Sequence, residues 1–299
     1  MRVAIVGWFY RGGNPDLSQY AADQLEEQGV DITKIGPGMA RWDRIKEINK
    51  VDVVYAISHS CSWRFFGLTK VLGKKTVNHW IGTDVLCALT DKRYRWKAKI
   101  TSLFLDKHLA IAPHLVQELG SIGILAEEIP LVRQPIPNTL RPPDPIELRA
   151  LAYLPDEWEE FYGASVVYQL AQQFPQLQFL IVGATRKRQT NLPNVSSLGL
   201  VPDVDMNEVY KMAPILIRVT QHDGLPAMVL EALANGNQVI YSYDFPYCYR
   251  ARNFEEAAAC LEKIIANGCP INYEGRRYVI ENYDRQIASK RLLAALSTA

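Results

Sequence analysis

Short, continuously apolar segments alternate with amphipathic segments along the whole chain. Runs of this kind, bounded by turn residues, are typical of strands buried on both faces of a parallel sheet, and they occupy residues 3–7, 51–56, 76–80, 106–112, 128–132, 151–154, 178–182, 195–199, 215–219 and 238–242. Several of the segments between them have the spacing of amphipathic helices, namely residues 17–28, 62–72, 91–105, 113–119, 165–174, 207–212, 254–266 and 274–296. The alternation predicts an α/β fold with mostly parallel sheets.

This alternation occurs twice, on either side of a proline-rich segment. Residues 134–145 contain five prolines in twelve residues, so they cannot form an ordinary helix or strand. We therefore expect an N-terminal Rossmann-like domain over 1–133, a hinge over 134–145, a C-terminal Rossmann-like domain over 146–270, and a terminal helix within 271–299 that packs across the domain junction. Two such domains predict a cleft between the carboxyl edges of two sheets, where nucleotide-sized ligands bind.

Composition narrows the class of protein. The chain has 299 residues, of which 48% are hydrophobic, and this is enough for two cores. The net charge of +1 argues against nucleic acid as the main partner. Five scattered cysteines without a CxxC spacing predict a reduced, cytoplasmic protein without a cysteine metal site, and we expect neither a metal nor a cofactor. The N-terminus predicts a strand rather than a signal peptide, and no segment approaches the roughly 20 apolar residues of a membrane span.

Candidate chemistry is concentrated in residues 222–242, HDGLPAMVLEALANGNQVIYS. Pro226 and the pair Asn235-Gly236 delimit one short helix, which is followed by a strand. The helix comes directly after the turn Asp223-Gly224-Leu225, so its free N–H groups and the positive end of its dipole favour an anion there. Glu231 lies among apolar residues of the helix, where a carboxylate needs a partner. The hydroxyls of a ribose would supply that partner, as would the backbone or a nearby arginine.

Further candidates are expected at the carboxyl ends of strands in both halves. In the C-terminal half, the residues that could hold or neutralise a diphosphate are Gly183, Arg186, Lys187, Arg188 and Arg218, although 186–188 also fit a solvated loop. In the N-terminal half, Gly12 and Gly13 permit close backbone approach to a ligand or form a plain turn. His79 and Asp84 are expected on a loop that follows a strand, which is where open α/β sheets bind ligands.

The run from 151 to 242 resembles the C-terminal domain of GT-B glycosyltransferases and is most similar to the retaining family 4 group. The resemblance rests on residues 174–183, 198–217 and above all 222–240. In that family an acidic residue and a glutamate with seven residues between them flank a glycine turn, and the glutamate holds the nucleotide ribose. The matching residues here are Asp223 and Glu231. The N-terminal half adds Gly12-Gly13, which resembles the family's glycine loop, and residues 78–86, NHWIGTDVL, which resemble the segment with the active-site histidine.

The resemblance implies a GT-B fold and a metal-independent, retaining glycosyltransferase of the hexosyltransferase type. Such an enzyme moves a sugar from a nucleotide-diphosphate sugar to a hydroxyl of a glycan, a lipid-linked acceptor or a small molecule. The implied catalytic or sugar-contacting residues are His79, Asp84 and Asp223. The implied donor-binding residues are Gly12, Gly13, Gly183, Arg186, Lys187, Arg218, Gly224, Leu225 and Glu231.

One segment departs from the family pattern. The family usually places an arginine and a lysine in and just after the first strand of the C-terminal domain to neutralise the diphosphate, but residues 151–165 contain no basic residue and several acidic ones. Either the bases at 186–188 and Arg218 replace them, or the donor is unusual, or transfer activity has been lost. A binding protein without transfer activity and a sugar-nucleotide epimerase therefore remain as alternatives.

A second basic feature lies in the N-terminal half. Five of the eight residues from Lys92 to Lys99 are basic, and Trp96, Ile100, Leu103 and Phe104 share one face of the expected helix. This pattern fits a solvated helix. It also fits peripheral contact of residues 92–104 with anionic lipid, or with a phosphorylated acceptor.

Overall fold

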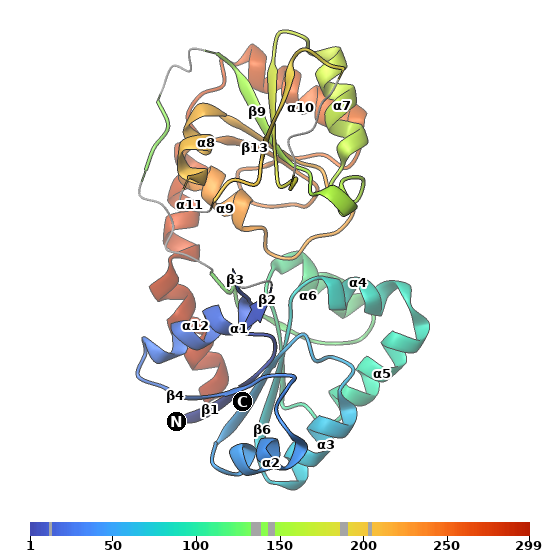
Figure 1. The fold of residues 1–299 in the computed structure, drawn as a ribbon, viewed down its shortest axis with the longest axis vertical. Helices are drawn as coiled ribbons and strands as arrows, with labels where there is room; N and C mark the ends of the chain where they lie inside the picture. The colour runs from blue at the N-terminus through green and yellow to red at the C-terminus, as the bar shows by residue number, and fades with distance from the viewer. Residues whose placement is uncertain (12–13, 133–138, 143–146, 186–190, 203–204) are drawn as a thin grey trace. The chain divides into compact units, whose positions relative to one another are not determined.

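The computed structural model describes residues 1–11, 14–132, 139–142, 147–185, 191–202 and 205–299 (Figure 1). The chain divides into two compact units. Unit 1 comprises Met1–Pro135 and Asp284–Ala299, and unit 2 comprises Ile136–Tyr283. The chain therefore returns to unit 1 after completing unit 2.

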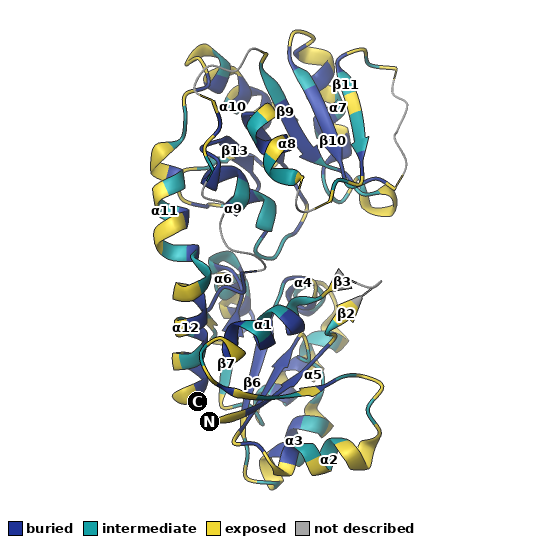
Figure 2. Ribbon diagram, turned by 60° about the vertical axis from the view of Figure 1, so that its left-hand side comes forward, coloured by how far each residue is buried: buried dark blue, intermediate teal, exposed yellow. Residues whose placement is uncertain are grey.

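Unit 1 is built on a six-stranded parallel sheet in the order β4-β1-β5-β6-β7-β8. Its strands are β1 Arg2–Val6, β4 Asp31–Ile35, β5 Val53–Ile57, β6 Lys75–Trp80, β7 Lys107–Ala110 and β8 Glu127–Glu128. A small antiparallel hairpin, formed by β2 Tyr10–Arg11 and β3 Asn14–Pro15, follows β1. The central strands are buried on both faces (Figure 2), as their continuous apolar sequence predicts.

The helices of unit 1 are α1 Leu17–Glu26, α2 Arg41–Asn49, α3 Trp63–Val71, α4 Thr83–Thr90, α5 Lys92–Ser102, α6 Pro113–Ser121 and α12 Arg285–Ser297. Alternate residues of the strands pack against α2 and α3, where Ile48 and Phe66 are fully buried. The terminal helix α12 packs against α1. Arg285 at its start forms hydrogen bonds with the carboxylate of Glu27, the nearest at 2.8 Å.

Unit 2 contains a second six-stranded parallel sheet, in the order β11-β10-β9-β12-β13-β14. Its strands are β9 Arg149–Tyr153, β10 Gln178–Val182, β11 Val195–Gly199, β12 Ile215–Arg218, β13 Gln238–Tyr241 and β14 Tyr249–Arg250. Counted along the chain, this is the order 3-2-1-4-5-6 of a Rossmann sheet. The direction of winding reverses between β9 and β12, so this pair marks the switch point at which such sheets bind ligands.

Helices cover both faces of this sheet, and the alternation of side chains along each strand separates two cores. The helices are α7 Ala164–Gln173, α8 Met206–Met212, α9 Ala227–Ala234, α10 Phe254–Ala266 and α11 Tyr273–Tyr283, with a 3-10 turn at Asp156–Trp158. Ala150, Ala152 and Ile217 face α7 and α10. Leu151 and Leu216 face the opposite core, which includes residues of α8, α9 and α11.

The expected α/β architecture is confirmed, and several expected elements change. The single helix expected over 274–296 is two helices, α11 in unit 2 and α12 in unit 1, separated at Asp284, whose carboxylate caps α12. Residues 139–142 of the expected hinge lie in unit 2. There Arg141 is buried and donates hydrogen bonds to the carbonyls of Gly236 and Cys269. The strand β4 and the helices α2 and α4 are absent from the sequence-based assignment.

Candidate nucleotide-sugar site

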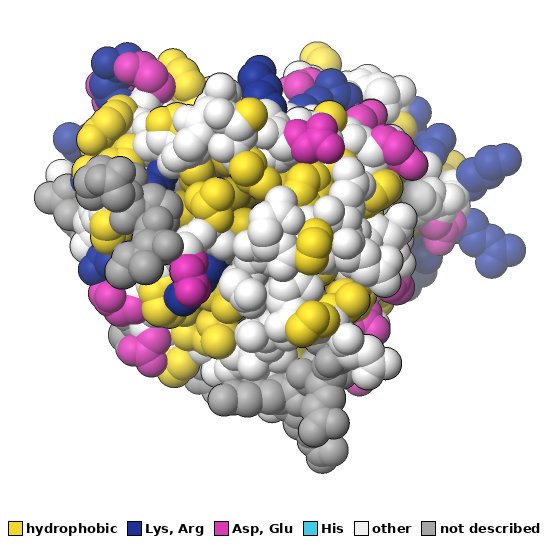
Figure 3. All heavy atoms as spheres, turned by 90° about the horizontal axis from the view of Figure 1, so that it is seen from above, with side chains coloured by type: hydrophobic (Ala, Val, Ile, Leu, Met, Phe, Trp, Pro, Cys, Tyr) yellow, Lys and Arg dark blue, Asp and Glu magenta, His cyan; other side chains and the backbone are white. Residues whose placement is uncertain are grey.

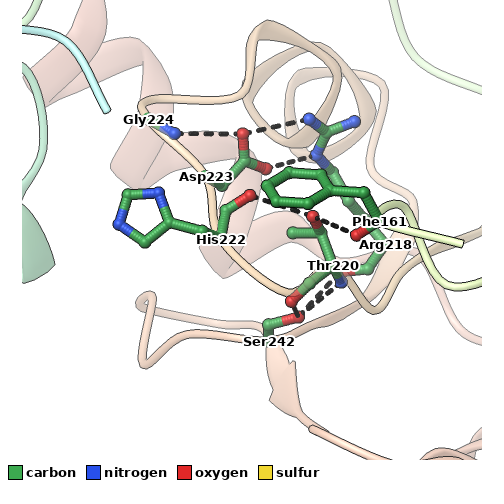
Figure 4. Close-up of polar contacts among 7 residues, drawn as sticks. All are labelled: Phe161, Arg218, Thr220, His222, Asp223, Gly224 and Ser242. Atoms are coloured by element: carbon green, nitrogen blue, oxygen red, sulfur yellow. Dashed lines mark hydrogen bonds and ion pairs between the residues drawn. The ribbon is translucent and has the colours of Figure 1, made fainter. Parts of the chain in front are cut away.

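The strongest cluster of polar groups lies at the carboxyl edge of the unit 2 sheet, at its switch point. Tyr153 ends β9 and Arg218 ends β12, the strand beside it. The turn 223–225 and the start of α9 follow β12 in sequence. The predicted residues Arg218, Asp223 and Gly224 are thereby brought together (Figure 4).

Arg218 and Asp223 form a two-point ion pair. Nε of Arg218 donates to Oδ2 of Asp223 at 2.6 Å, and Nη2 donates to Oδ1 at 3.1 Å. The side chains are only 9% and 10% exposed. Oδ1 also accepts a hydrogen bond from the N–H of Gly224 at 3.0 Å, so the carboxylate fixes the glycine turn to the end of β12 (Figure 4).

Two aromatic rings enclose the guanidinium. Its central carbon lies 5.7 Å from the ring centre of Tyr153 and 5.1 Å from that of Tyr162, within the range of cation–π attraction. Burial lowers the pKa of Arg218, but the carboxylate of Asp223 outweighs this and raises the pKa overall. Sequence reasoning missed both tyrosines, although Tyr153 carries a signal as the polar-tipped residue that ends a buried strand.

Gly183 takes part in the same packing. It follows β10 with φ of +100°, and a Cβ atom there would lie 2.5 Å from the ring of Tyr153. The absence of a side chain therefore lets the tyrosine lie across the end of β10. The described contacts give Gly183 this packing role, and its predicted contact with a donor stays a prediction.

Ser242, the residue after β13, braces the loop between β12 and the turn. Its hydroxyl accepts from the N–H of Thr220 at 2.7 Å and donates to the carbonyl of Thr220 at 2.8 Å. The hydroxyl of Thr220 lies within hydrogen-bond distance of the carbonyls of His222 and Phe161 (Figure 4). These bonds hold the backbone that presents Asp223.

Glu231 lies on α9 and has a defined partner. The hydroxyl of Tyr210, on α8, donates to its Oε2 at 2.7 Å. The residue is half-buried, whereas its helix neighbours Leu230 and Ala232 are buried in the core. Leu225 packs against the same core. A carboxylate that is held by a tyrosine hydroxyl at a partly exposed position suits a ligand with adjacent hydroxyls.

In unit 1 the structure corrects the predicted placement of His79. The residue lies inside β6, within the strand predicted over 76–80 and not on the loop after it, and its side chain is fully buried. The hydroxyl of Tyr55 lies 2.6 Å from its Nδ1 atom. Burial lowers the pKa of His79 to about 3, so the imidazole is neutral near pH 7. In this position the ring is part of the core and does not reach solvent.

Asp84 is likewise displaced from its predicted loop, because it belongs to the first turn of α4. Its Oδ1 accepts hydrogen bonds from the N–H groups of Ile81, Gly82 and Val85 at 3.0 to 3.1 Å. Its Oδ2 is buried without a hydrogen-bond partner among the described residues. Burial raises the pKa of Asp84 to about 6, because the hydrogen bonds from the three N–H groups, which lower the pKa, offset the effect of burial only in part. The local geometry is that of a carboxylate that orders the start of a helix.

The other predicted residues lie outside the described part of the chain, namely Gly12, Gly13, Arg186, Lys187 and Arg188. Within the described part, no group of three or more His, Cys, Asp or Glu side chains is arranged to hold a metal ion. None of the described helices combines the length and the apolar character needed to cross a membrane.

No protein-family model matches the chain, and no curated protein sequence matches it. Solved structures do match over its full length. Sucrose-phosphate synthase from Thermosynechococcus elongatus is 12% identical with a TM-score of 0.75, and the match covers 99% of this chain and 98% of that one. Anabaena HepE in complex with UDP-glucose is 10% identical with a TM-score of 0.73, and the match covers both chains completely.

A mutant of S. aureus TarM, solved with fondaparinux, alpha-GlcNAc-glycerol and UDP, is 11% identical with a TM-score of 0.60. This match covers 82% of this chain and 55% of that one. These structures are GT-B glycosyltransferases. With its two six-stranded parallel sheets, the chain has the GT-B fold.

Proposed function

We propose that the protein is a metal-independent, retaining glycosyltransferase that moves a sugar from a nucleotide-diphosphate sugar to an acceptor hydroxyl. The observation that carries this proposal is the position of Glu231. Its carboxylate is anchored by Tyr210 and stands on the helix that starts beside the switch point of a Rossmann sheet. HepE, which shares the fold, was solved with UDP-glucose, and this supports a nucleotide sugar as the donor class.

The donor binds to unit 2 in this proposal. Glu231 accepts hydrogen bonds from the two ribose hydroxyls, because a carboxylate can accept several bonds at once. The backbone around Gly224 and the start of α9 hold diphosphate oxygens, where the dipole of the helix favours negative charge. Asp223 contacts the transferred sugar. We assign no substrate contact to His79, whose side chain has no exposed surface.

Catalysis then depends on position and on charge. Holding the anomeric carbon beside an acceptor hydroxyl supplies the proximity, and N–H groups and a cation stabilise the leaving diphosphate. Arg218 is the cation that the described residues place at the switch point. Its charge is balanced by Asp223. Arg218 therefore stabilises the leaving diphosphate only if the diphosphate binds the guanidinium alongside Asp223 or displaces Asp223 from it.

The same pair favours a second candidate function, binding of the nucleotide sugar without transfer. Residues 151–165 lack the basic residues that the resemblance implies, and Arg218 is already neutralised. A cation that is already paired stabilises a leaving diphosphate poorly, and Arg218 is the base that the described residues place at the switch point. Release of UDP from UDP-glucose above the uncatalysed rate, with or without an acceptor, would separate the enzyme from this binding protein.

The nucleotide assignment is tested by titration calorimetry with UDP and UDP-glucose. Glu231→Gln keeps an oxygen that can accept from Tyr210 but removes the charge. We expect its affinity to fall roughly 10- to 100-fold, since a hydrogen bond to a charged group contributes about 1.5 to 3 kcal/mol. Glu208→Gln, at an exposed glutamate on α8, is the matched control and should bind as the wild type does. Equal affinity of the Glu231 variant and the wild type would exclude the ribose assignment.

Separate measurements test the stereochemistry of transfer, its independence of metal ions, and the alternative that the protein is an epimerase. The anomeric configuration of the product, followed by NMR during the reaction, decides whether transfer is retaining. Activity that survives EDTA would support metal independence, and activity that returns only with a divalent ion would exclude it. A UDP-glucose epimer, formed from donor alone, would identify an epimerase instead.

A further inference from the structure

The helix α5 exposes two large apolar side chains, Trp96 and Leu103, of the face that its sequence would ordinarily bury. The other two residues of that face are partly buried, and Phe104 packs against the core of unit 1. Lys92, Trp96, Lys99 and Leu103 follow one another at helical spacings of four, three and four residues, so they form one stripe along α5 and its cap, here called the α5 stripe. Trp96 is 63% exposed and Leu103 is 79% exposed. The residues that α5 buries are the small Ala98 and Thr101.

Packing against neighbouring elements fixes this orientation. The hydroxyl of Tyr94 lies 2.8 Å from that of Ser60, which is buried before the start of α3. Arg95 donates to the carbonyls of Ala88 and Leu89, at the end of α4. Tyr94 lies on the far side of α5 from the stripe, whereas Arg95 lies beside the stripe. The helix α5 packs against both α3 and α4 (Figures 1 and 2). The exposure of Trp96 and Leu103 is therefore built into the fold of unit 1.

The charged side chains of α5 itself have one sign, and acidic residues flank the helix at Asp91 and Asp106. Lys92, Arg93, Lys97 and Lys99 are all exposed, and within the described part of the chain none of the four forms an ion pair. From residue 92 to residue 105 the chain contains no acidic residue. By contrast, the end of the molecule seen in Figure 3 shows acidic and basic side chains interspersed among small hydrophobic groups.

We propose that the α5 stripe docks unit 1 onto the surface of an anionic phospholipid bilayer. The lysines and arginine would meet the phosphate and carboxylate headgroups. Trp96 would lie at the level of the headgroups, and Leu103 would enter the acyl boundary, as in other interfacial helices. Charge alone would also suit a polyanion such as RNA. The exposed tryptophan and leucine between the bases favour a lipid surface, because a solvated phosphate backbone offers leucine no apolar partner.

The neighbouring helix α3 adds to the same kind of surface. Trp63 is 37% exposed, and the guanidinium carbon of Arg64 lies 5.0 Å from its ring centre. This pairing of an aromatic ring with a base at the start of α3 repeats the chemistry of the stripe. The proposal concerns unit 1 alone and stands whether or not unit 2 binds a nucleotide sugar.

The test is co-sedimentation of the full-length protein with vesicles of phosphatidylcholine, with and without phosphatidylserine. We expect binding only to the vesicles that contain phosphatidylserine, and weaker binding as salt is raised. Each base near a membrane surface contributes roughly a factor of five, so Lys92→Gln/Lys99→Gln should lower the partition coefficient about 25-fold. The control is Lys46→Gln/Lys50→Gln, at the C-terminal end of α2 and its cap, which removes the same charge from exposed lysines next to acidic partners. This control should bind nearly as the wild type does.

The apolar part is tested separately. Trp96→Ser should lower vesicle binding, whereas Trp158→Ala should not, although Trp158 is exposed to nearly the same extent, 62% against 63%. Brominated lipid should quench the fluorescence of the wild type more than that of Trp96→Phe. Three results would overturn the proposal: no binding to phosphatidylserine vesicles at low salt, equal loss in the stripe and control variants, or binding to RNA that is as tight as binding to the vesicles and indifferent to Trp96.

Discussion

The ion pair between Arg218 and Asp223 makes a quantitative prediction about the stability of unit 2. Both side chains are about nine-tenths buried, and the pair is two-pointed, with contacts of 2.6 and 3.1 Å. Asp223→Asn removes the negative charge and keeps the shape of the side chain. The guanidinium is then left without a counter-ion between the rings of Tyr153 and Tyr162.

The cost follows from desolvation. Removing one partner of a buried pair typically costs about 3 to 5 kcal/mol, because an uncompensated charge remains in a site of low polarity. We expect a loss in this range for Asp223→Asn and for Arg218→Met. The double variant leaves no unpaired charge, so its free energy of unfolding should fall by much less than the sum of the two single losses.

Urea unfolding of the four proteins, followed by circular dichroism, measures these free energies and completes the double-mutant cycle. Asp244→Asn provides the control, because Asp244 pairs with Arg250 at 2.9 Å but is 81% exposed. An exposed pair contributes less than about 1 kcal/mol. If Asp223→Asn costs no more than Asp244→Asn, or if the two single losses add, the buried pair does not carry the energy assigned to it here.

Three further predictions concern other buried groups. Burial raises the pKa of Asp84 from 3.8 to about 6, so the unfolded chain loses this proton at a lower pH than the folded protein does. Relative to Asp84→Asn, the wild type should therefore lose roughly 3 kcal/mol of stability as pH rises from 4 to 6. Urea unfolding across that range measures the loss. His79 has the opposite effect on stability, because its pKa in the folded protein, about 3, lies below the ordinary value of 6.5. Relative to His79→Gln, the wild type should lose stability as pH falls from 6.5, by roughly 5 kcal/mol at pH 3. Parallel pH profiles of stability for the two proteins would contradict this prediction. Gly163→Ala should destabilise unit 2 by at least about 2 kcal/mol, because φ is +82° and the new Cβ would lie 2.0 Å from the carbonyl oxygen of Val219. An unchanged melting temperature would show that the backbone accommodates the added methyl group without this cost.

The strands were predictable because their signal is local. The strand β10 has the bounds that its apolar run predicts, since residues buried on both faces leave a continuous signal. The edge strand β11 also has the predicted bounds, although only Gly199 of its residues is buried. The strand β4 gave no such signal. It lies at the edge of its sheet, and only Ile35 of its residues is buried, so the sequence Asp31–Ile35 reads as polar.

The orientation of a helix depends on its neighbours, so the sequence could not predict which face of α5 is buried. The sequence places Trp96 and Leu103 on one face, and an apolar face ordinarily packs inward. Here α5 packs against α3 and α4 and buries the small residues Ala98 and Thr101, while Trp96 and Leu103 are exposed. Spacing alone identifies the faces of a helix, whereas tertiary packing decides which of them is buried.

The sequence also could not predict which of the candidate side chains contact one another. Arg218 and Asp223 were both predicted at the site, with separate roles toward the diphosphate and the sugar. The structure joins them to each other, because the turn after β12 carries the carboxylate back over the end of the strand. Tyr210 comes from α8, a different helix from that of Glu231, and no spacing in the sequence indicates this contact.

The absence of basic residues from 151–165 and the Arg218–Asp223 pair are connected at the end of β9. Tyr153 stands at the end of the first strand of the sheet, in the segment where the resemblance implies a base, and the guanidinium from the adjacent strand β12 lies over its ring. The switch point thus keeps a cation that comes from a different strand and is balanced by Asp223. If this cation serves the diphosphate, Asp223 competes with the ligand for it. We therefore expect Asp223→Asn to bind UDP, which lacks the transferred sugar assigned to Asp223, more tightly than the wild type does, even as unit 2 becomes less stable.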